Sequence, residues 1–400
     1  MRQFDVVIGA NFGDEGKGVF TSFLATRNPD AIIVRFNGGS NASHTVTVED
    51  PKMGVMRHAF RHLGSGTFSG NPTFLSEDFI INPLMLFEEM DVVIKKFGII
   101  PRLIIDPNCV VSTPYDMLIN QWLEESRNHR HGSCGVGINE TVTRSQECPL
   151  MAKDIHKPKT EVYELIKDIR DIYFSARLNT LGLTLTNDQK ELFSNEQLLE
   201  NFVEDFMSLN MISQIPIKHI LLSYDHLIFE GAQGLALDQT MGTFPHVTRS
   251  NTGLTNIAKY LQLTCTDDIN ISVHYMTRCY LTRHGEGPFN EAEDFPPIID
   301  ETNIPNEWQG TMRFGWLNID ELKQRIEQDL KNVCHIKNVI PSLNVTCLDQ
   351  LHVIPVIKDG LMHIIQPKVF HRYLTHAIPN VPTKVTFSGL IDKWEYHDYT

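Results

Sequence analysis

The sequence lacks paired cysteines. Its seven cysteines are odd in number and widely spaced, and no two of them form a CxxC motif. This distribution excludes a disulfide framework and a cysteine-based zinc site, and it predicts reduced thiols in a cytoplasmic protein. No apolar run approaches the length of a membrane span, and the N-terminal segment continues directly into a strand-like run without a signal peptide. We therefore expect no association with membranes.

Clusters of basic residues are also missing. The formal net charge is −14 at pH 7, and no block of Lys and Arg stands out. An acidic surface of this kind argues against a nucleic-acid partner. It does not exclude small anionic substrates, because a pocket can be locally positive on an acidic protein.

Short apolar runs that end in glycine-rich or polar loops recur along the chain. They predict buried strands at residues 4–9, 31–36, 103–107, 226–232, 271–277 and 342–349. Segments with helical spacing separate them. We therefore expect an α/β fold with a large, mostly parallel sheet flanked by helices, and with ligands at the carboxyl ends of the strands. Residues 158–212 differ, because their charged and long aliphatic residues predict two or three amphipathic helices joined around Asn187.

The first motif is Gly-Asp-Glu-Gly-Lys-Gly at residues 13–18, between a predicted strand and a predicted helix. Its glycines allow backbone N–H groups to approach phosphate oxygens, and Lys17 can neutralise a transferring phosphoryl group. The motif is not a Walker loop, because Gly18 replaces the Ser or Thr that usually binds Mg²⁺. Asp14 fits a role in binding Mg²⁺ or in removing a substrate proton. The alternative is a glycine-rich turn with exposed charges.

Two further loops carry polar residues. His44 ends the glycine-rich segment 37–44, where it can donate a hydrogen bond to a developing oxyanion or a phosphate. The alternative is a surface or structural histidine. Gln233 lies in Phe-Glu-Gly-Ala-Gln-Gly at 229–234, where its amide can bind a base or a phosphate. The alternative for this segment is a strand–loop–helix connection without a ligand.

Together, these loops resemble the adenylosuccinate synthetase family. The segments that carry the resemblance are GDEGKG after VVIGANF, RFNGGSNASHT, FEGAQG and GTFPHVTRSN, followed in the same order by YLTRHGEGPF, FGWLN and VTCLD. The resemblance covers most of the chain and is weakest at 150–220. It implies one domain over residues 1–400, with a P-loop-NTPase-like sheet and the helical subregion 158–212. It also implies a Mg²⁺-dependent homodimer that uses GTP to couple L-aspartate to C6 of a purine mononucleotide such as IMP.

The resemblance implies catalytic roles residue by residue. Asp14 matches the base that takes the N1 proton of the purine, and it also binds Mg²⁺ together with the backbone carbonyl of Ser43. His44 matches the general acid that stabilises O6 and the phosphoryl group. Lys17 and Gln233 complete the catalytic set.

The resemblance implies separate residues for the two nucleotides. The purine mononucleotide is expected to contact Asn41, Ser133, Cys134, Arg144 and Thr248. GTP is expected to contact Gly13, Glu15, Gly16, Lys17, Gly18, Asp349, Ser388 and Gly389. In the family an Asp at the position of Asp349 accepts from guanine N1 and N2, which favours GTP over ATP. A family Lys near this position is replaced here by Cys347.

Three segments depart from the family pattern. Ser133 and Cys134 stand where the family has paired Thr residues for the 5′-phosphate, and Cys134 is a poor substitute. Arg144 stands near an Arg that reaches into the neighbouring subunit's site. In the segment 308–316, only Thr311 and Arg313 remain of the family residues that hold the carboxylates of aspartate. One Arg can still bind a carboxylate bidentately, but the identity of the acceptor amine stays open.

Three other functions stay open at this point. Phage members of the family act on dGMP to make a precursor of 2-aminoadenine and often replace the base Asp by Ser, whereas this chain keeps Asp14. A catalytically silent nucleotide-binding protein would not need the acid–base pair of Asp14 and His44. An ordinary P-loop GTPase is disfavoured because no Ser or Thr follows Lys17.

Overall fold

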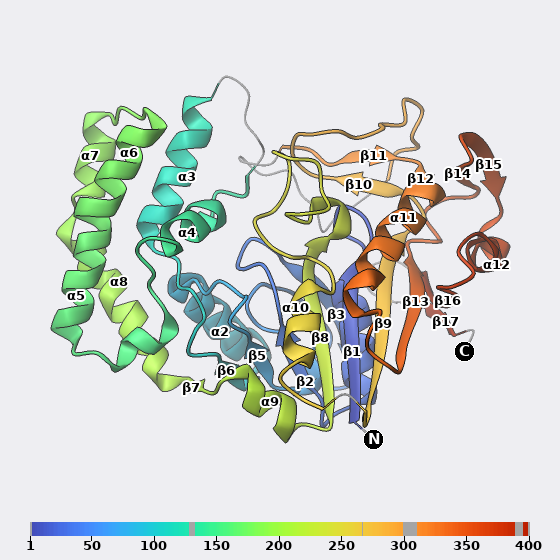
Figure 1. Ribbon diagram of the computed structural model, residues 1–400, viewed down its shortest axis with the longest axis horizontal. Coiled ribbons are helices and arrows are strands. Elements are labelled where there is room, and N and C mark those ends of the chain that lie inside the picture. Colours follow the sequence, from blue (N-terminus) through green and yellow to red (C-terminus); the bar gives the residue numbers. More distant parts are fainter. Residues whose placement is uncertain (1, 128–132, 266, 299–309, 389–394, 399–400) are drawn as a thin grey trace.

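A ten-stranded sheet forms the centre of the protein (Figure 1). The computed structural model describes residues 2–127, 133–265, 267–298, 310–388 and 395–398. Neighbouring strands of this sheet run parallel, except that the edge strand β17 is antiparallel to β16. In spatial order the strands are β17 (Glu395–Asp398), β16 (Thr383–Ser388), β13 (Val339–Thr346), β9 (Ile269–Arg278), β1 (Arg2–Gly9), β8 (His226–Gly234), β2 (Ile32–Arg35), β5 (Thr73–Leu75), β6 (Leu103–Ile105) and β7 (Ser213–Gln214).

The predicted α/β fold with a large, mostly parallel sheet is confirmed. All six predicted strands are present, and the last one ends earlier than expected. β13 ends at Thr346, so residues 347–349 belong to the loop that follows it. The described α-helices are α1 (Lys17–Arg27), α2 (Pro83–Phe97), α3 (Pro114–Ser126), α4 (Ile138–Ser145), α5 (Lys159–Asp168), α6 (Ser175–Leu181), α7 (Asn187–Phe193), α8 (Glu196–Ser208), α9 (Ile217–Ser223), α10 (Thr255–Leu261), α11 (Ile319–Leu330) and α12 (Pro367–Ala377).

The central strands are apolar because helices cover both faces of the sheet. In β1, the side chains of Phe4, Val6 and Ile8 belong to the larger core cluster, whereas Val7 faces a second cluster with Phe20 of α1. Successive strand residues point to opposite faces, so one continuous apolar run fills two cores. Residues of α9, α10 and α11 complete the first core. The polar loops lie outside these two cores, at the carboxyl ends of the strands.

The helical subregion lies at one end of the molecule, far from β13 and β16 (Figure 1). A π-helical segment, Ile169–Phe174, joins α5 to α6, and Gly182 then ends this long helix with a left-handed backbone. α7 begins after a capping box formed by Thr186 and Gln189. Three helical stretches therefore fill the predicted interval, with a break just before Asn187. The predicted amphipathic helices are confirmed.

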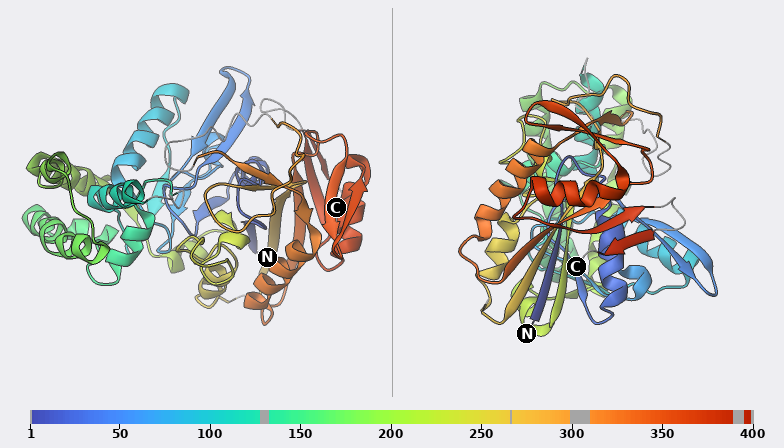
Figure 2. Two further views of the ribbon diagram at one scale, coloured as in Figure 1. Left: turned by 90° about the horizontal axis from the view of Figure 1, so that it is seen from above. Right: turned by 90° about the vertical axis from the view of Figure 1, so that its right-hand side faces the viewer.

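Three smaller sheets are found among the described residues. They are the hairpin β3 (His44–Asp50) with β4 (Gly54–Phe60), the pair β10 (Leu281–Arg283) with β11 (Arg313–Gly315), and the sheet β12 (Leu317–Asn318), β14 (Ile354–Lys358) and β15 (Leu361–Ile365). The hairpin projects from the body of the molecule (Figure 2). All seven cysteines are free. None of the helices in the described ranges has the length and apolar character needed to cross a membrane.

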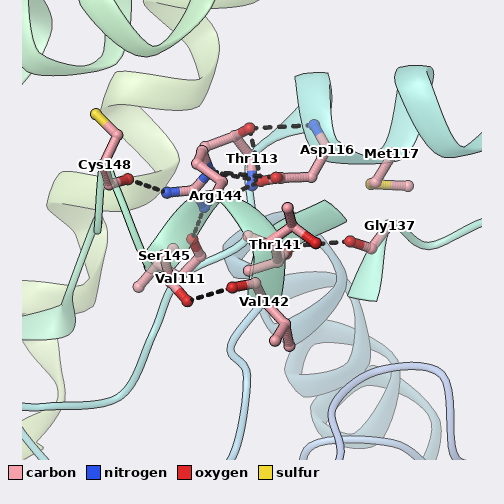
Figure 3. A network of polar contacts seen from close by, with 12 residues as sticks. Val111, Thr113, Asp116, Met117, Gly137, Thr141, Val142, Arg144, Ser145 and Cys148 are labelled. Atoms are coloured by element: carbon pink, nitrogen blue, oxygen red, sulfur yellow. Dashed lines mark hydrogen bonds and ion pairs between the residues drawn. The ribbon is translucent and has the colours of Figure 1, made fainter. Parts of the chain in front are cut away.

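A buried ion pair joins α3 to α4 (Figure 3). The Asp116 carboxylate accepts from Arg144 Nη2 at 3.0 Å and also caps its own helix through Thr113. Arg144 further donates to the carbonyls of Val111 at 2.7 Å and Cys148 at 2.9 Å. Both charged side chains are fully buried. The carboxylate and carbonyls thus hold the guanidinium in the interior of this chain, and the expected contact of Arg144 with the substrate stays a prediction.

We predict that Asp116→Asn destabilises the protein by about 3–5 kcal/mol, because the substitution leaves the Arg144 charge buried without a counter-charge. The free energy of unfolding in guanidinium chloride measures this effect. Asp91→Asn is the matched control, since Asp91 pairs with Lys95 on the exposed surface of α2. Its effect should stay within about 0.5 kcal/mol. An equal decrease in the free energy of unfolding in the two variants would contradict a structural role for the buried pair.

Candidate functional site

A cavity of about 760 Å³ opens at the carboxyl ends of the central strands. The loops after β1 and β8 meet there, as expected for ligand sites in parallel sheets. The sequence motifs 13–18, 41–44 and 246–249 all contribute to the lining, together with Gln233. The same cavity extends to Ser133 and Cys134 at one end and to Thr346, Cys347 and Gln350 at the other. Segments from both halves of the chain therefore line one cavity, which is large enough for more than one ligand.

The loop 13–18 has the backbone of a phosphate-binding turn. Gly13, Asp14 and Gly16 have positive φ angles of 100°, 58° and 82°. A Cβ atom on Gly16 would lie 2.6 Å from the side chain of Thr346, so the loop packs against β13 without space for a side chain. α1 starts directly afterwards without a side-chain cap. Its first N–H groups are thus directed to the cavity, where they can bind a phosphate.

Two charged residues of this loop are buried beneath it. Lys17 is 4% exposed and Glu15 is 3% exposed. Burial raises the pKa of Glu15 to about 7, although Lys17 opposes the rise, and burial lowers the pKa of Lys17. Glu15 Oε1 accepts from the backbone N–H of Asn11 at 2.7 Å. These charges are therefore internal parts of the site, which contradicts the alternative of a turn with exposed charges.

His44 is paired with a buried carboxylate. Its Nδ1 lies 2.6 Å from Glu230 Oε1, and Glu230 also accepts from the Ser65 backbone N–H at 3.0 Å and from the Ser65 hydroxyl. Burial lowers the pKa of His44 to about 4 despite the attraction of Glu230. Burial opposes ionisation of Glu230, yet the charge and hydrogen bond of His44 hold its pKa at about 2. The pair is a carboxylate with a neutral imidazole that donates from Nδ1.

Asp14 has more contact with solvent than this pair. Its side chain is 33% exposed and lines the cavity, with Oδ2 3.6 Å from His284 Nε2. The backbone carbonyl of Asp14 accepts from Arg278 Nε, which anchors the loop to the end of β9. The site thus holds a half-exposed carboxylate and a buried imidazole on different loops. Two titratable groups in such different environments suit opposite roles in proton transfer.

Several buried polar atoms at the cavity find no hydrogen-bond partner among the described residues. They include His44 Nε2, Asn41 Oδ1, Gln233 Oε1 and Glu15 Oε2. Buried polar groups are rarely left unpaired in a protein interior, so their convergence on one cavity indicates a polar ligand. Gln233, next to the last residue of β8, also adopts a strained left-handed φ of 55°.

The structure brings most of the predicted residues together. The cavity is lined by the predicted Gly13, Asp14, Glu15, Gly16, Lys17, Gly18, Asn41, Ser43, His44, Ser133, Cys134, Gln233 and Thr248. Of the described residues, Arg144, Thr311, Arg313 and Asp349 do not line it. Gly389 lies outside the described residues. Arg313 donates to the carbonyls of Gly285 and Gly287 and pairs with Glu291, so it supports the loop behind the cavity wall.

The residues present fit a magnesium ion held partly by substrate. In the described ranges, no three His, Cys, Asp or Glu side chains are placed to hold a metal. Mg²⁺ usually binds one or two protein oxygens together with phosphates and waters. The Asp14 carboxylate and the Ser43 segment, which both line the cavity, supply oxygen ligands of that kind.

Sequence reasoning assigned no role to three residues of the site. Glu230 orients His44, His284 faces Asp14, and Gln350 lines the far end of the cavity. Glu230 had a usable signal, because an acid inside an apolar strand must find a partner when it is buried. His284 and Gln350 lie in loops whose course the local sequence does not determine.

The family model for adenylosuccinate synthetase matches residues 6–379 of the chain. An adenylosuccinate synthetase of Borrelia duttonii is 28% identical over 382 residues, covering 91% of this chain and 81% of the relative. One from Clostridium botulinum is 32% identical over 342 residues, covering 80% and 73%. Sequence and site geometry therefore lead to the same family.

Two solved structures share the fold. A fully ligated adenylosuccinate synthetase from Plasmodium falciparum has a TM-score of 0.72 at 20% identity and covers 98% of each chain. The succinoaminodeoxyadenylate synthetase of cyanophage S-2L, bound to dGMP and to dATP as an energy donor, has a TM-score of 0.60 at 13% identity, covering 99% of this chain and 95% of that one.

We predict that Glu230→Gln lowers turnover at least about 10²-fold while nucleotide affinity changes little. The substitution keeps the shape but removes the charge that stabilises a protonated His44. Steady-state kinetics and equilibrium nucleotide binding measure the two effects separately. Glu49→Gln, on the same strand as His44 but exposed to solvent, is the control and should leave turnover unchanged. A Glu230→Gln protein with normal turnover would remove the pair from the mechanism.

Proposed function

Because the chain belongs to the adenylosuccinate synthetase family, whose members are ligases that form carbon–nitrogen bonds, we propose that it couples L-aspartate to C6 of a 6-oxopurine mononucleotide, with GTP as the phosphoryl donor. The observation that carries this proposal is the placement of Asp14 and the His44–Glu230 pair around the phosphate-binding loop. A protein that only bound nucleotides would not need these two proton-transfer groups.

In the first step, Asp14 takes the proton from N1 of the purine, and the electrons move to the 6-oxygen. The 6-oxygen attacks the γ-phosphorus of GTP, and GDP leaves. His44 donates to the oxygen and the phosphoryl group, while Lys17 balances the negative charge beside the loop. Mg²⁺ at Asp14 would neutralise the phosphate oxygens during this transfer.

In the second step, the amine of aspartate attacks C6, phosphate leaves with the former 6-oxygen, and the nitrogen loses one proton to the departing phosphate. The two carboxylates of aspartate need fixed cations in a desolvated site. Arg283 lines the cavity; its Nη atoms donate to the carbonyls of Pro288 and Glu286, and its buried Nε has no partner among the described residues. Arg313 holds the neighbouring carbonyls of Gly285 and Gly287. We therefore propose that Arg283 meets one carboxylate and that Arg313 keeps the loop, together with Thr311, in place around the amino acid.

IMP is the mononucleotide that we propose. Asp14 is retained, and its carboxylate stands where phage members with a dGMP substrate often have a smaller Ser. The cyanophage structure with dGMP shows the same fold at 13% identity, which makes dGMP the second candidate. A 2-amino group is the only difference at the base that the enzyme would have to accommodate.

The direct test is a ligation assay with purified protein, GTP, Mg²⁺ and aspartate, in which IMP, GMP and dGMP are offered in turn. We expect a succinylated purine nucleotide from IMP, identified by mass spectrometry, with stoichiometric release of phosphate. A product from dGMP alone would establish the phage-type reaction. If GTP hydrolysis does not depend on aspartate, the proposed ligation is wrong.

We predict that Asp14→Asn and His44→Asn each reduce turnover at least about 10²-fold, because each removes a proton-transfer or oxyanion-stabilising group. Binding of the mononucleotide should change by much less, since the other contacts of the cavity remain. The assay above gives the rates, and fluorescence titration gives the affinities. A variant with wild-type turnover would exclude that residue from the chemistry.

We also predict that nucleotide binding is coupled to proton uptake by His44. Its pKa is about 4 before ligands bind, and phosphate charges near Nε2 raise it. The complex then holds more protons than the free protein at pH values between about 4 and the raised pKa, so affinity increases as the pH falls through that range. Isothermal titration calorimetry in buffers with different ionisation enthalpies measures the uptake. His44→Asn should abolish it, and equal uptake by both proteins would contradict the coupling.

A further inference from the structure

Gln350 lies at the end of the cavity wall formed by β13 and the loop after it. β13 ends at Thr346, and the chain turns at Cys347, which has a left-handed φ of 62°. The backbone N–H of Gln350 donates to the Cys347 carbonyl at 3.3 Å and closes the turn. Gln350 lines the cavity, whereas the neighbouring Asp349 does not. The turn therefore presents the amide of Gln350 to a ligand.

A chain of hydrogen bonds fixes the orientation of this amide. Arg278 Nη1 donates to Tyr280 Oη at 3.0 Å, and an arginine can only donate. Tyr280 Oη therefore accepts from Arg278 and donates its own proton to Gln350 Oε1. Burial raises the pKa of Tyr280, so the phenol keeps this proton. With Oε1 held in this way, Gln350 Nε2 is left to donate into the cavity.

The same series of hydrogen bonds connects Gln350 to the phosphate-binding loop. Arg278 Nε donates to the backbone carbonyl of Asp14, and Thr346 packs against the loop at Gly16. A triphosphate bound at the loop shares the cavity with the mononucleotide, which we place beside His44. Its base is therefore directed to the opposite side, along Thr346 and toward Gln350.

We propose that Gln350 selects the base of the phosphoryl donor by donating a hydrogen bond to the 6-oxygen of a 6-oxopurine triphosphate. This inference rests on the proposed function, because it takes the donor to be a purine triphosphate. Guanine has an acceptor at C6, whereas adenine has an N–H donor there. An adenine at this position would leave two donors facing each other without acceptors, which lowers its affinity.

Binding of inosine triphosphate (ITP) distinguishes base selection by Gln350 from base selection by Asp349. Inosine keeps the 6-oxygen of guanosine but lacks its 2-amino group. If Gln350 selects the base, GTP and ITP should bind with similar affinity and ATP more weakly. If a carboxylate accepts from the 2-amino group, GTP should bind more tightly than ITP. Gln350→Glu keeps an oxygen for Tyr280 and replaces the donor by an acceptor, so the variant should prefer the 6-amino group of adenine.

The experiment measures the dissociation constants of the imidotriphosphate analogues of GTP, ITP and ATP for the full-length protein with Mg²⁺ and IMP. We expect the wild type to bind the GTP and ITP analogues at least about tenfold more tightly than the ATP analogue. Gln350→Glu should lower this preference at least about tenfold and leave the GTP-to-ITP ratio unchanged. Gln262→Glu, the same change on an exposed residue outside the cavity, should alter neither ratio.

Tyr280→Phe tests the positioning of the amide. Without the phenol, the Gln350 amide can turn either way, so the preference for 6-oxopurines should fall while the affinity for the ATP analogue rises or stays constant. If Tyr280 had only a structural role, its replacement would weaken the binding of all three analogues equally. An unchanged ratio in Gln350→Glu, or a wild type that binds the ATP analogue as tightly as the GTP analogue, overturns this inference alone. A wild type that binds none of the analogues overturns the proposed function with it.

Discussion

The candidate site depends on one buried carboxylate, that of Glu230. It lies on β8 and accepts hydrogen bonds from His44, at the start of β3, and from Ser65, in the loop after β4. A buried charge is tolerated only when partners satisfy it, so this carboxylate fixes three segments that are distant in the sequence. Arg35, fully buried on the adjacent strand β2, adds a compensating positive charge. The imidazole is thus oriented by the core of the sheet, and only its Nε2 edge is directed toward a ligand.

Close backbone packing then sets the distance between the phosphate-binding loop and this pair. A Cβ on Gly18 would lie 2.8 Å from the Cβ of His44, and one on Gly16 would overlap Thr346 of β13. The loop is therefore held between two strand ends, so that the start of α1, the imidazole and the end of β13 all face one cavity. A phosphoryl group between two nucleotides needs this arrangement, because its donor and acceptor must approach from opposite sides.

The sequence was sufficient for the sheet and for the centre of the site. The strand runs are continuous and apolar because both faces of the sheet are covered, and the loops that follow them have unusual glycine and polar patterns. It was insufficient where a residue's neighbours come from distant segments. The resemblance places Arg144 near the substrate, and the sequence does not show that Asp116 on the preceding helix pairs with it in the interior. The resemblance assigns Arg313 to aspartate, and the sequence does not show that the carbonyls of Gly285 and Gly287 also accept from its guanidinium. Spacing along the chain does not reveal such competition between a ligand and internal acceptors.

Two departures from the family pattern, at Cys134 and at Cys347, lie in the lining of the cavity away from its catalytic centre. In the proposed reaction, Asp14, Lys17 and His44 serve the proton and phosphoryl transfers, which are the same for any 6-oxopurine and any amine. Cys134 and Cys347 lie toward the opposite ends, near the proposed mononucleotide phosphate and the donor base. At those positions an altered contact changes which molecule binds without changing the chemistry, because function resides in the site and not in the fold. The hydrogen bonds from Arg278 to Tyr280 and from Tyr280 to Gln350 position the proposed contact with the donor base. Arg278 also donates to the carbonyl of Asp14, so this contact is held at a constant distance from the phosphate-binding loop.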